Sequence, residues 1–397
     1  MIGDCFFYTK EELEFKKELR GWLEEKIAPL VQPAIAGDYD KIREALKLMA
    51  KRDLLGAIHS KEYGGTEKGV AWESIIAEEV ARINGAIEMT RLVSATLFGV
   101  PIAKYAKPEV KKKYIPKIIK GEMIGAIAMT EEVAGSDLAR MQTQISVEGD
   151  YYVINGEKKF ITNGGKCDIL SVYGVLDTID DPNPRKKITG LLVETKTPGF
   201  KVAEEYDLVG MEGASVARLV FDNVKVPKEN LLGKEGQGFY ILMDELNVER
   251  IGMAAACVGH AAAAFDKAVE HAHNRVQFKQ PVYKFEGVSF RLAEAFTKIR
   301  AARLLTLEAA RYIDAGDEET ATIGASTAFS FATEMEIEVT NYCMQTLAGR
   351  AITDRTGLVA CAWRMAPVMW TVGGTTDIQK FVIQREISKD YKAKQAQ

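Results

Sequence analysis

The order of hydrophobic periodicities along the chain is the strongest constraint on its fold. Apolar residues recur at helical spacing over about the first third of the 397 residues; a strand-like stretch follows, and the helical period then returns and persists. This order predicts an α+β fold with three parts. We expect an N-terminal α-helical domain at 1–125, a middle antiparallel β-sheet domain at 126–235, and a C-terminal domain with a four-helix bundle at 236–397.

Local signals support the helical part. Thr9 and Glu12 have capping-box spacing, and they precede apolar residues that would form one face of a helix. Breakers such as Tyr63-Gly64-Gly65 divide the rest of this region. Further helices are expected at about 40–54, 71–84, 87–105 and 109–120.

The middle region has short segments rich in β-branched residues, bounded by Gly, Pro, Asp and Asn. Within the segment YYVINGEKKFIT, the dipeptide Asn155-Gly156 is expected to form a type I′ hairpin turn between two strands. Further strands are expected in ILSVYGVL, KITGLLVETK and ARLVFDNVKV. Together they predict an antiparallel sheet or barrel.

The charge balance argues against several classes of protein. The chain has 52 basic and 56 acidic residues, so it lacks the cationic character that nucleic-acid binding requires. No uninterrupted apolar stretch approaches the roughly 20 residues of a membrane-spanning helix. No basic region leads into an apolar run at the beginning of the sequence, so no secretory signal is expected and the expected location is cytoplasmic.

Cysteines and histidines offer little chemistry. The five cysteines are scattered without C-x-x-C spacing, which predicts neither a disulfide framework nor a zinc site. His271 and His273 would point about 200° apart on a helix, so no metal is expected there. Neither a nucleophile elbow nor a Walker loop is present. Carboxylates, hydroxyls, backbone groups or an organic cofactor must therefore carry any reaction.

One motif, at residues 130–137, has the sequence TEEVAGSD. Its Thr130 and Ser136 could donate to a ligand, although the same residues also suit a helix cap or a Ser/Thr turn. Three further blocks follow in the chain, namely Phe160-Ile161-Thr162-Asn163, Arg275-Val276-Gln277-Phe278 and Val372-Gly373-Gly374-Thr375-Thr376-Asp377-Ile378-Gln379.

These four blocks, in this order and over almost the whole chain, resemble the acyl-CoA dehydrogenase family. The sequence departs from the family pattern at Arg140 and Lys279. The resemblance implies an FAD bound between the β domain and the C-terminal bundle, with an acyl-CoA against the flavin. It also implies that Arg275 and Phe278 contact the FAD of a neighbouring subunit, where a solvated arginine and a core phenylalanine are the alternative reading.

The resemblance assigns further cofactor contacts. Each could otherwise be an ordinary strand, turn or helix residue. The set comprises Met129, Thr130, Ser136, Phe160, Ile161, Thr162, Gln345, Gly349, Thr375 and Asp377.

The position of the catalytic base is unusual. Most family members carry a carboxylate where this chain has Gly373, whose backbone N–H could still polarise the thioester carbonyl. A subset that includes isovaleryl-CoA dehydrogenases carries the base in an L-x-x-E-R-like context, and this chain has Leu246-Asn247-Val248-Glu249-Arg250. The resemblance therefore implies Glu249 as the base; its alternative is a helix-surface glutamate.

Substrate contacts are also implied by the resemblance. The helix near residues 87–98 should line the distal acyl pocket, where polar side chains suggest a polar or compact acyl tail, although a solvated helix face explains Glu88 and Arg91 equally well. The expected substrate contacts are Glu88, Arg91, Thr96, Ser136, Arg250 and Gly374.

The resulting hypothesis is FAD-dependent dehydrogenation of an acyl-CoA to a 2-enoyl-CoA, with electrons passed to electron-transfer flavoprotein by a homotetramer. One alternative is a family member with changed chemistry on a CoA thioester. This could be a non-redox elimination, or a 1,4-dehydrogenation of a cyclic enoyl-CoA with Glu88 as a second carboxylate. A second alternative is a catalytically silent binding protein that retains only the scaffold.

Overall fold

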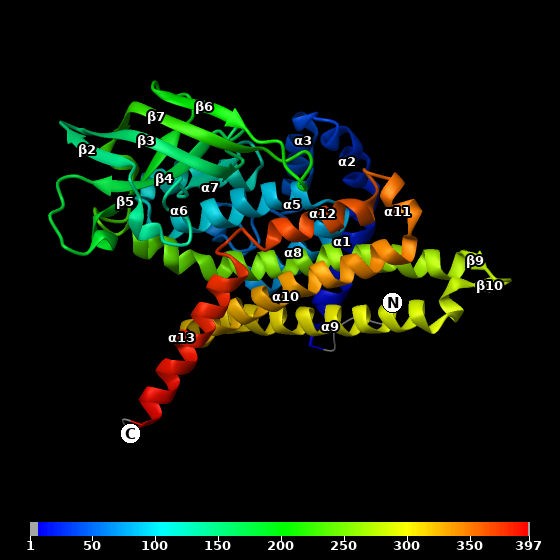
Figure 1. Cartoon of the computed structure of the whole chain (residues 1–397). Helices are drawn as coiled ribbons and strands as arrows, with labels where there is room; N and C mark the ends of the chain where they lie inside the picture. The colour runs from blue at the N-terminus through cyan, green and yellow to red at the C-terminus, as the bar shows by residue number, and fades with distance from the viewer. Residues whose placement is uncertain (1–6, 396–397) are drawn as a thin grey trace.

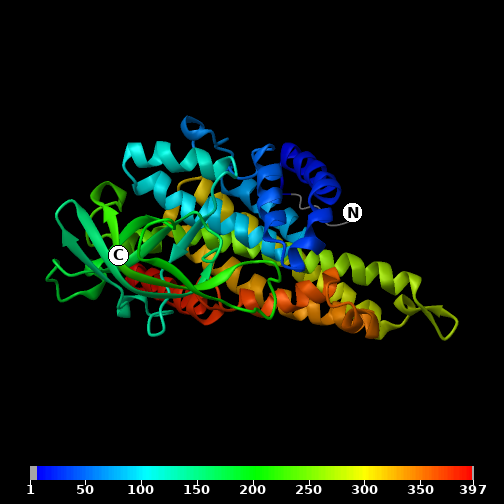
Figure 2. The same cartoon turned by 90° about the horizontal axis from the view of Figure 1, so that it is seen from above.

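The computed structural model describes residues 7–395; residues 1–6, which include Cys5, and 396–397 lie outside the described part. The chain forms a helical N-terminal region, a β-rich middle and a helical C-terminal region, as the periodicities predict (Figure 1). Seen from above, the β-rich part lies at one end of the elongated molecule and a small hairpin at the other (Figure 2). The long helix α8 (Gly238–Asn274) runs between these two ends.

The N-terminal helices follow the predicted order. The capping box on α1 is confirmed, since the Glu12 N–H donates to Thr9 Oγ1 at 3.2 Å and the Thr9 N–H donates to Glu12 Oε2 at 2.8 Å. The helices are α1 (Lys10–Lys26), α2 (Ala28–Ile35), α3 (Tyr39–Ala50), α4 (Val70–Ile83), α5 (Gly85–Leu92), α6 (Gly99–Tyr105) and α7 (Pro108–Ile119).

A π-helical turn at Val93–Phe98 joins α5 to α6, so that residues 85–105 form one nearly continuous helical stretch. This stretch is long and apolar enough to cross a membrane, but 89% of its most apolar window is buried inside the protein. It therefore has the position of a core helix. It packs against both the sheet and α8.

The sheet has eight strands in the order β6-β7-β3-β2-β4-β5-β8, with β1 on the side of β4. Most neighbours are antiparallel, as expected, but β1 and β2 each pair with β4 in parallel. The strands are β1 (Gly125–Ala128), β2 (Gln144–Glu148), β3 (Tyr151–Thr162), β4 (Ile169–Leu176), β5 (Ile188–Glu194), β6 (Phe200–Glu205), β7 (Val216–Pro227) and β8 (Leu231–Leu232).

The predicted hairpin turn at Asn155-Gly156 is wrong. Both residues lie inside β3, where the pairing with β7 is irregular next to Gly156, and the chain reverses earlier, between β2 and β3 at Gly149-Asp150. A Cβ at position 156 would lie 2.7 Å from Thr143 Oγ1. The glycine therefore permits a close approach between strands, a role that the Asn-Gly dipeptide alone does not distinguish from a turn.

Three long helices, α8, α9 (Glu286–Asp314) and α10 (Glu318–Leu347), lie side by side in the C-terminal region (Figure 1). Small alanines of α8 permit close packing against α4 and α10. Three shorter helices complete the region, and the last of them extends away from the body (Figure 1). They are α11 (Gly349–Thr353), α12 (Leu358–Met369) and α13 (Thr376–Gln395).

Candidate active site

Two segments far apart in the sequence meet where α8 passes the loop before α13. Arg250 Nε of α8 donates to the Gly373 carbonyl at 3.5 Å, so the fold brings the predicted base segment to the predicted polarising loop. Glu249 is only 5% exposed and Arg250 only 6%. The reading of Glu249 as a helix-surface residue is therefore wrong, because the side chain is almost fully buried.

The Gly373 backbone disfavours a side chain at this position. Its φ is +61°, and a Cβ built there would lie 2.0 Å from the terminal methyl of Met253, one helical turn beyond Glu249 on α8. Among residues 7–395, the Gly373 N–H has no hydrogen-bond acceptor. The loop thus offers an unpaired backbone donor in place of a carboxylate.

The Glu249 carboxyl lacks internal partners. Its Oε2 is buried, and no described residue hydrogen-bonds to it. Burial raises the pKa of Glu249 to about 7, and the neighbouring Arg250 charge only partly opposes this rise. At neutral pH the group is divided between the proton-donating and proton-accepting forms, as a general base requires.

Glu245 is a second buried carboxyl, one turn before Glu249, and the sequence did not single it out as a site residue. It is 3% exposed, and neither of its oxygens has a hydrogen-bond partner among the described residues. Burial, reinforced by the charge of Glu249, holds its pKa well above the ordinary value. Because residues four apart share a helix face, α8 presents two unpaired carboxyls together.

Gln379 of α13 fixes the loop. Its Nε2 donates to the carbonyls of Gly373 and Gly374 at 3.3 and 2.7 Å, while its Oε1 is buried without a described partner. The sequence reading included this residue in a block but gave it no role. Thr375 caps α13 by accepting from the Ile378 N–H at 3.3 Å, and Asp377 is exposed in the first helical turn.

The residues assigned to the flavin cluster at the end of β3. Phe160 adopts φ +58° at an irregularity in the β3–β7 pairing, and its ring is 62% exposed with its centroid 5.1 Å from that of Tyr206. Thr162 is half-buried beside it, whereas the Ile161 side chain enters the core at 2% exposure. This strand end presents an aromatic surface to any ligand held there.

The segment Met129-Thr130 lies beside β3 and is held by it. The Lys159 N–H donates to the Thr130 carbonyl at 2.8 Å, and the buried Lys158 Nζ donates to the Met129 carbonyl at 3.2 Å. Both segments are therefore fixed together near the C-terminal end of β3. Ser136 lies farther along the same loop and is exposed.

A second group lies at the far end of α8. A cavity of about 580 Å³ is lined by Arg275, Gln345 and Gly349, and Arg275 has no ion-pair partner among the described residues. Phe278 is 88% exposed on the hairpin of β9 (Val276–Gln277) and β10 (Gln280–Pro281). Phe278 and Lys279 both have positive φ, so they form the two-residue turn of this hairpin.

Three expected substrate contacts, all on the α5 segment, form a closed network instead. Arg91 is fully buried and donates to Glu88 at 2.8 Å and to Glu73 at 2.7 Å, and Thr96 Oγ1 also donates to Glu73, at 3.1 Å. The alternative of a solvated helix face is wrong for Glu88 and Arg91. The structure pairs these side chains with one another, and their role as substrate contacts stays a prediction.

Comparison with known proteins identifies the family. Three family models match in order: the N-terminal domain of acyl-CoA dehydrogenase at residues 9–122, the middle domain at 126–224 and the C-terminal domain at 236–388. The chain belongs to the acyl-CoA dehydrogenase family. This acyl-CoA dehydrogenase is an oxidoreductase, and its helical, β and helical regions are those of the family fold.

Individual relatives and structures agree with this assignment. Cyclohex-1-ene-1-carbonyl-CoA dehydrogenase of Geobacter metallireducens is 37% identical over 86% of this chain and 89% of its own. The structure of butyryl-CoA dehydrogenase from Megasphaera elsdenii has a TM-score of 0.88 at 33% identity, covering 96% of this chain and 99% of its own. An acyl-CoA dehydrogenase of Bacillus anthracis complexed with FAD has a TM-score of 0.91 at 25% identity, covering 96% and 69%, respectively.

Proposed function

We propose that this acyl-CoA dehydrogenase binds FAD and oxidises an acyl-CoA thioester to a 2-enoyl-CoA, with Glu249 as the catalytic base. The observation that carries the proposal is that two groups without hydrogen-bond partners lie on segments that the Arg250–Gly373 contact brings together. These groups are the buried Glu249 carboxyl and the free N–H of Gly373. With this base position, the chain would belong to the subset that includes isovaleryl-CoA dehydrogenases.

The chain's residues fit an FAD. Phe160 and Thr162 offer an open surface beside Met129-Thr130, where an isoalloxazine ring would lie. Arg275 lines the 580 Å³ cavity without an internal carboxylate, and a guanidinium suits a pyrophosphate. Gly349 also lines this cavity, and a Cβ built there would meet nothing within 4 Å, so the space beside it is free. Gln345 lines the same cavity, while Ser136, Thr375 and Asp377 would complete the contacts.

The residues of the chain divide the reaction between them. Glu249 would remove the α-proton while the Gly373 N–H donates to the thioester carbonyl oxygen and makes that proton more acidic. Arg250 and Gly374 would hold the thioester end of the substrate against this loop, and Ser136 would contact the pantetheine chain. When bound, the flavin supplies the acceptor for the hydride that leaves Cβ.

The distance between Glu249 and the Arg275 group favours an oligomer. Arg275 follows Glu249 by 26 residues along α8 and its end, or about 39 Å at 1.5 Å per residue. That separation exceeds the length of one extended dinucleotide, so the Arg275 group would serve an FAD held mainly by another subunit. We therefore propose a homotetramer, with electron-transfer flavoprotein as the electron acceptor and a cytoplasmic location.

The test is anaerobic mixing of the FAD-loaded protein with a panel of CoA thioesters. Straight, branched and alicyclic saturated acyl-CoAs should bleach the flavin absorbance, and the product should be lighter by two hydrogens. A stable flavoprotein that no member of the panel bleaches would contradict the proposal. Failure to incorporate FAD at all would favour the silent scaffold instead.

A second candidate is the 1,4-dehydrogenation of a cyclic enoyl-CoA. It is favoured by Glu245, whose unpaired carboxyl could serve as the second carboxyl of such a reaction. Glu88 is less suited to this role, because it is hydrogen-bonded to Arg91. A relative that is 37% identical carries the name cyclohex-1-ene-1-carbonyl-CoA dehydrogenase. When cyclohex-1-ene-1-carbonyl-CoA is added to the panel, it should then bleach the flavin faster than any saturated thioester.

A further inference from the structure

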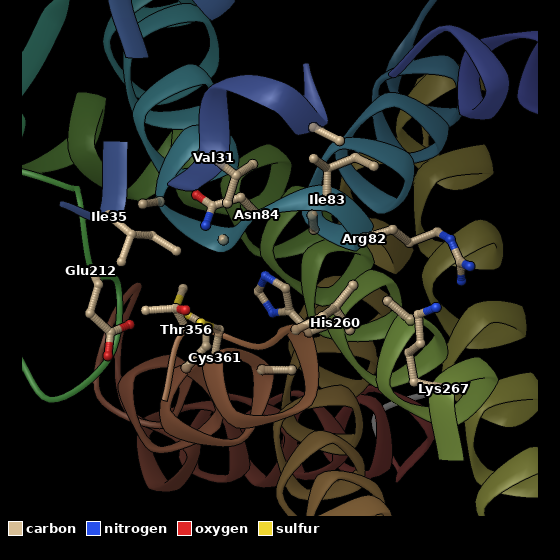
Figure 3. Close-up of a pocket in the computed structure, with 18 of the residues that line it drawn as sticks. Val31, Ile35, Arg82, Ile83, Asn84, Glu212, His260, Lys267, Thr356 and Cys361 are labelled. Atoms are coloured by element: carbon tan, nitrogen blue, oxygen red, sulfur yellow. The ribbon is translucent and has the colours of Figure 1, made fainter. Parts of the chain in front are cut away.

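A separate cavity of about 520 Å³ lies between α2, the α4–α5 junction, α8 and α12 (Figure 3). Its size is within the usual range for small-molecule sites. The close-up shows His260 of α8 on one wall, with Val31 and Asn84 on the wall facing it (Figure 3). None of the residues discussed above for FAD or acyl-CoA lines this cavity.

His260 carries an unsatisfied nitrogen into this space. The ring is 3% exposed, and its Nδ1 is 2.8 Å from Oε1 of Glu336, a residue of α10 that is fully buried. The other nitrogen, Nε2, is buried and has no hydrogen-bond partner among residues 7–395. A buried polar atom without a partner is costly, and a ligand that reaches it would remove that cost.

Gly85, the first residue of α5, lies beside this nitrogen and puts no side chain against it. A Cβ at position 85 would lie 2.8 Å from His260 Nε2 and 3.2 Å from the Met365 side chain. The preceding Asn84 caps α5 through Oδ1, which accepts from the Ile87 N–H at 3.0 Å. The backbone is thereby fixed, and a side chain at position 85 would press directly on Nε2.

The lining of the cavity favours an uncharged ligand. Aliphatic side chains, among them Val31, Ile35 and Met365, form part of its lining. Its three cations already have carboxylate partners: Arg20 binds Glu79 at 2.7 Å, Arg82 binds Asp266 at 2.5 Å and Lys267 binds Glu270 at 3.0 Å. No lining cation is left free for an anion. A hydroxyl can pair with either neutral tautomer of His260, because it both donates and accepts.

The cavity is separate from the proposed active site. His260 follows Glu249 by 11 residues, or about 16 Å along α8. Between them α8 packs tightly on its neighbours: a Cβ at Gly252 would lie 2.6 Å from Leu92, and one at Gly259 would lie 2.2 Å from the Glu78 carbonyl. Both glycines therefore lie in close contact with the N-terminal helices between the two sites.

We propose that this cavity is a second ligand site, which takes a compact, uncharged molecule with an aromatic or alicyclic body and one hydroxyl group hydrogen-bonded to His260 Nε2. The apolar body would pack against Val31, Ile35 and Met365. The ligand contacts nothing assigned to the dehydrogenation. The site is therefore independent of the acyl-CoA reaction.

The test uses titration calorimetry of phenol, benzene and benzoate into the full-length, FAD-loaded protein. Phenol should bind about five- to tenfold more tightly than benzene, since one net hydrogen bond distinguishes them. Benzoate should bind more weakly than phenol, and phenol should leave the rate of flavin reduction by acyl-CoA unchanged. Equal affinities for phenol and benzene, tighter binding of benzoate, or competition with acyl-CoA would overturn the proposal.

Two variants locate the binding. Gly85→Ala places a methyl at Nε2 and should weaken phenol binding at least tenfold. Gly99→Ala is its matched control, because a Cβ there also approaches a buried histidine, His59, at 2.9 Å, but that Nε2 is already 2.7 Å from the Ala95 carbonyl. Phenol binding should survive this change. Loss of phenol binding in both variants, or in neither, would contradict the assignment.

A double variant, His260→Phe with Glu336→Leu, removes the nitrogen without leaving a buried charge unpaired. In this protein phenol and benzene should bind equally. A retained preference for phenol would show that another group holds the hydroxyl, and would overturn the role of His260.

Discussion

Two buried clusters, each with two glutamates and an arginine, differ in how their carboxyls are hydrogen-bonded. In the α4–α5 cluster, Arg91 makes short hydrogen bonds to both Glu73 and Glu88. In the α8 cluster, Glu245 and Glu249 keep carboxyl oxygens without partners. Burial is similar in the two, so burial alone does not mark a reactive site.

The difference lies in where each arginine points. Arg91 is directed at its own carboxylates and at the Leu54 carbonyl, which closes the α4–α5 cluster. Arg250 reaches instead towards the Gly373 carbonyl at 3.5 Å, which ties the α8 cluster to a loop and leaves the acids to a ligand. Unpaired acids cost stability, and a structure that retains them is suited to binding or proton transfer.

The largest expected effect is on the rate of flavin reduction, which should depend on the α8 cluster and not on the α4–α5 cluster. Glu249→Gln should lower the rate of flavin reduction by acyl-CoA by 10²- to 10⁴-fold, the usual contribution of a general base, while FAD stays bound. Stopped-flow absorbance under anaerobic conditions measures this rate.

Glu88→Gln is the matched control in the α4–α5 cluster. It should alter the rate of flavin reduction by no more than a few-fold. Equal losses in both variants would restore Glu88 as a substrate contact and remove the distinction between the clusters. Retained bleaching in Glu249→Gln would remove Glu249 as the base.

Stability should show the reverse order. Arg91→Met leaves two buried carboxylates without their cation and should cost on the order of 3–5 kcal/mol. Arg250→Met removes the long contact to Gly373 and the charge beside Glu249, and should cost about 1 kcal/mol. Thermal unfolding of the two FAD-loaded variants, compared at one protein concentration, measures the difference. A larger loss for Arg250→Met would contradict the view that the α4–α5 cluster is the structural one.

The sequence could predict the order of regions, because periodicity reports which face of each element is buried. It also placed Glu249 and Gly373 in one site through motifs. It could not distinguish the two clusters, since both read as charged helix segments and their partners, such as Leu54 and Gly373, come from distant segments. The turn prediction at Asn155-Gly156 failed for the same reason. The glycine is required by a close contact with Thr143, which is distant from it in the local sequence pattern.

The pH dependence tests the raised pKa of Glu249. Its folded pKa of about 7 lies above the ordinary value of 4.5, so the stability contributed by the protonated form is complete below pH 4.5 and is lost as the pH rises through 7. Glu249→Gln should therefore raise the free energy of unfolding by up to about 3 kcal/mol at pH 8 and leave it unchanged at pH 4.5.

In the wild-type protein, flavin reduction should rise with pH and reach half of its maximum near pH 7, as the base ionises. Denaturant unfolding at several pH values and stopped-flow rates over the same range provide the two measurements. A rate that is independent of pH between 5 and 9 would show that Glu249 is not the titrating base.

The smallest expected effect concerns the Gly373 loop, which lies against the α8 cluster. Gly373→Ala places a methyl group against Met253 and forces a non-glycine residue to adopt φ +61°, which should cost about 1–2 kcal/mol of stability. Gly21→Ala, where a Cβ meets nothing within 4 Å, is the matched control and should be neutral or slightly stabilising.

Because the N–H of residue 373 shifts with the strained loop, Gly373→Ala should also slow flavin reduction. Adding Met253→Ala makes room for the methyl and should recover part of both losses; if it recovers neither, Met253 is not what excludes a side chain from this position.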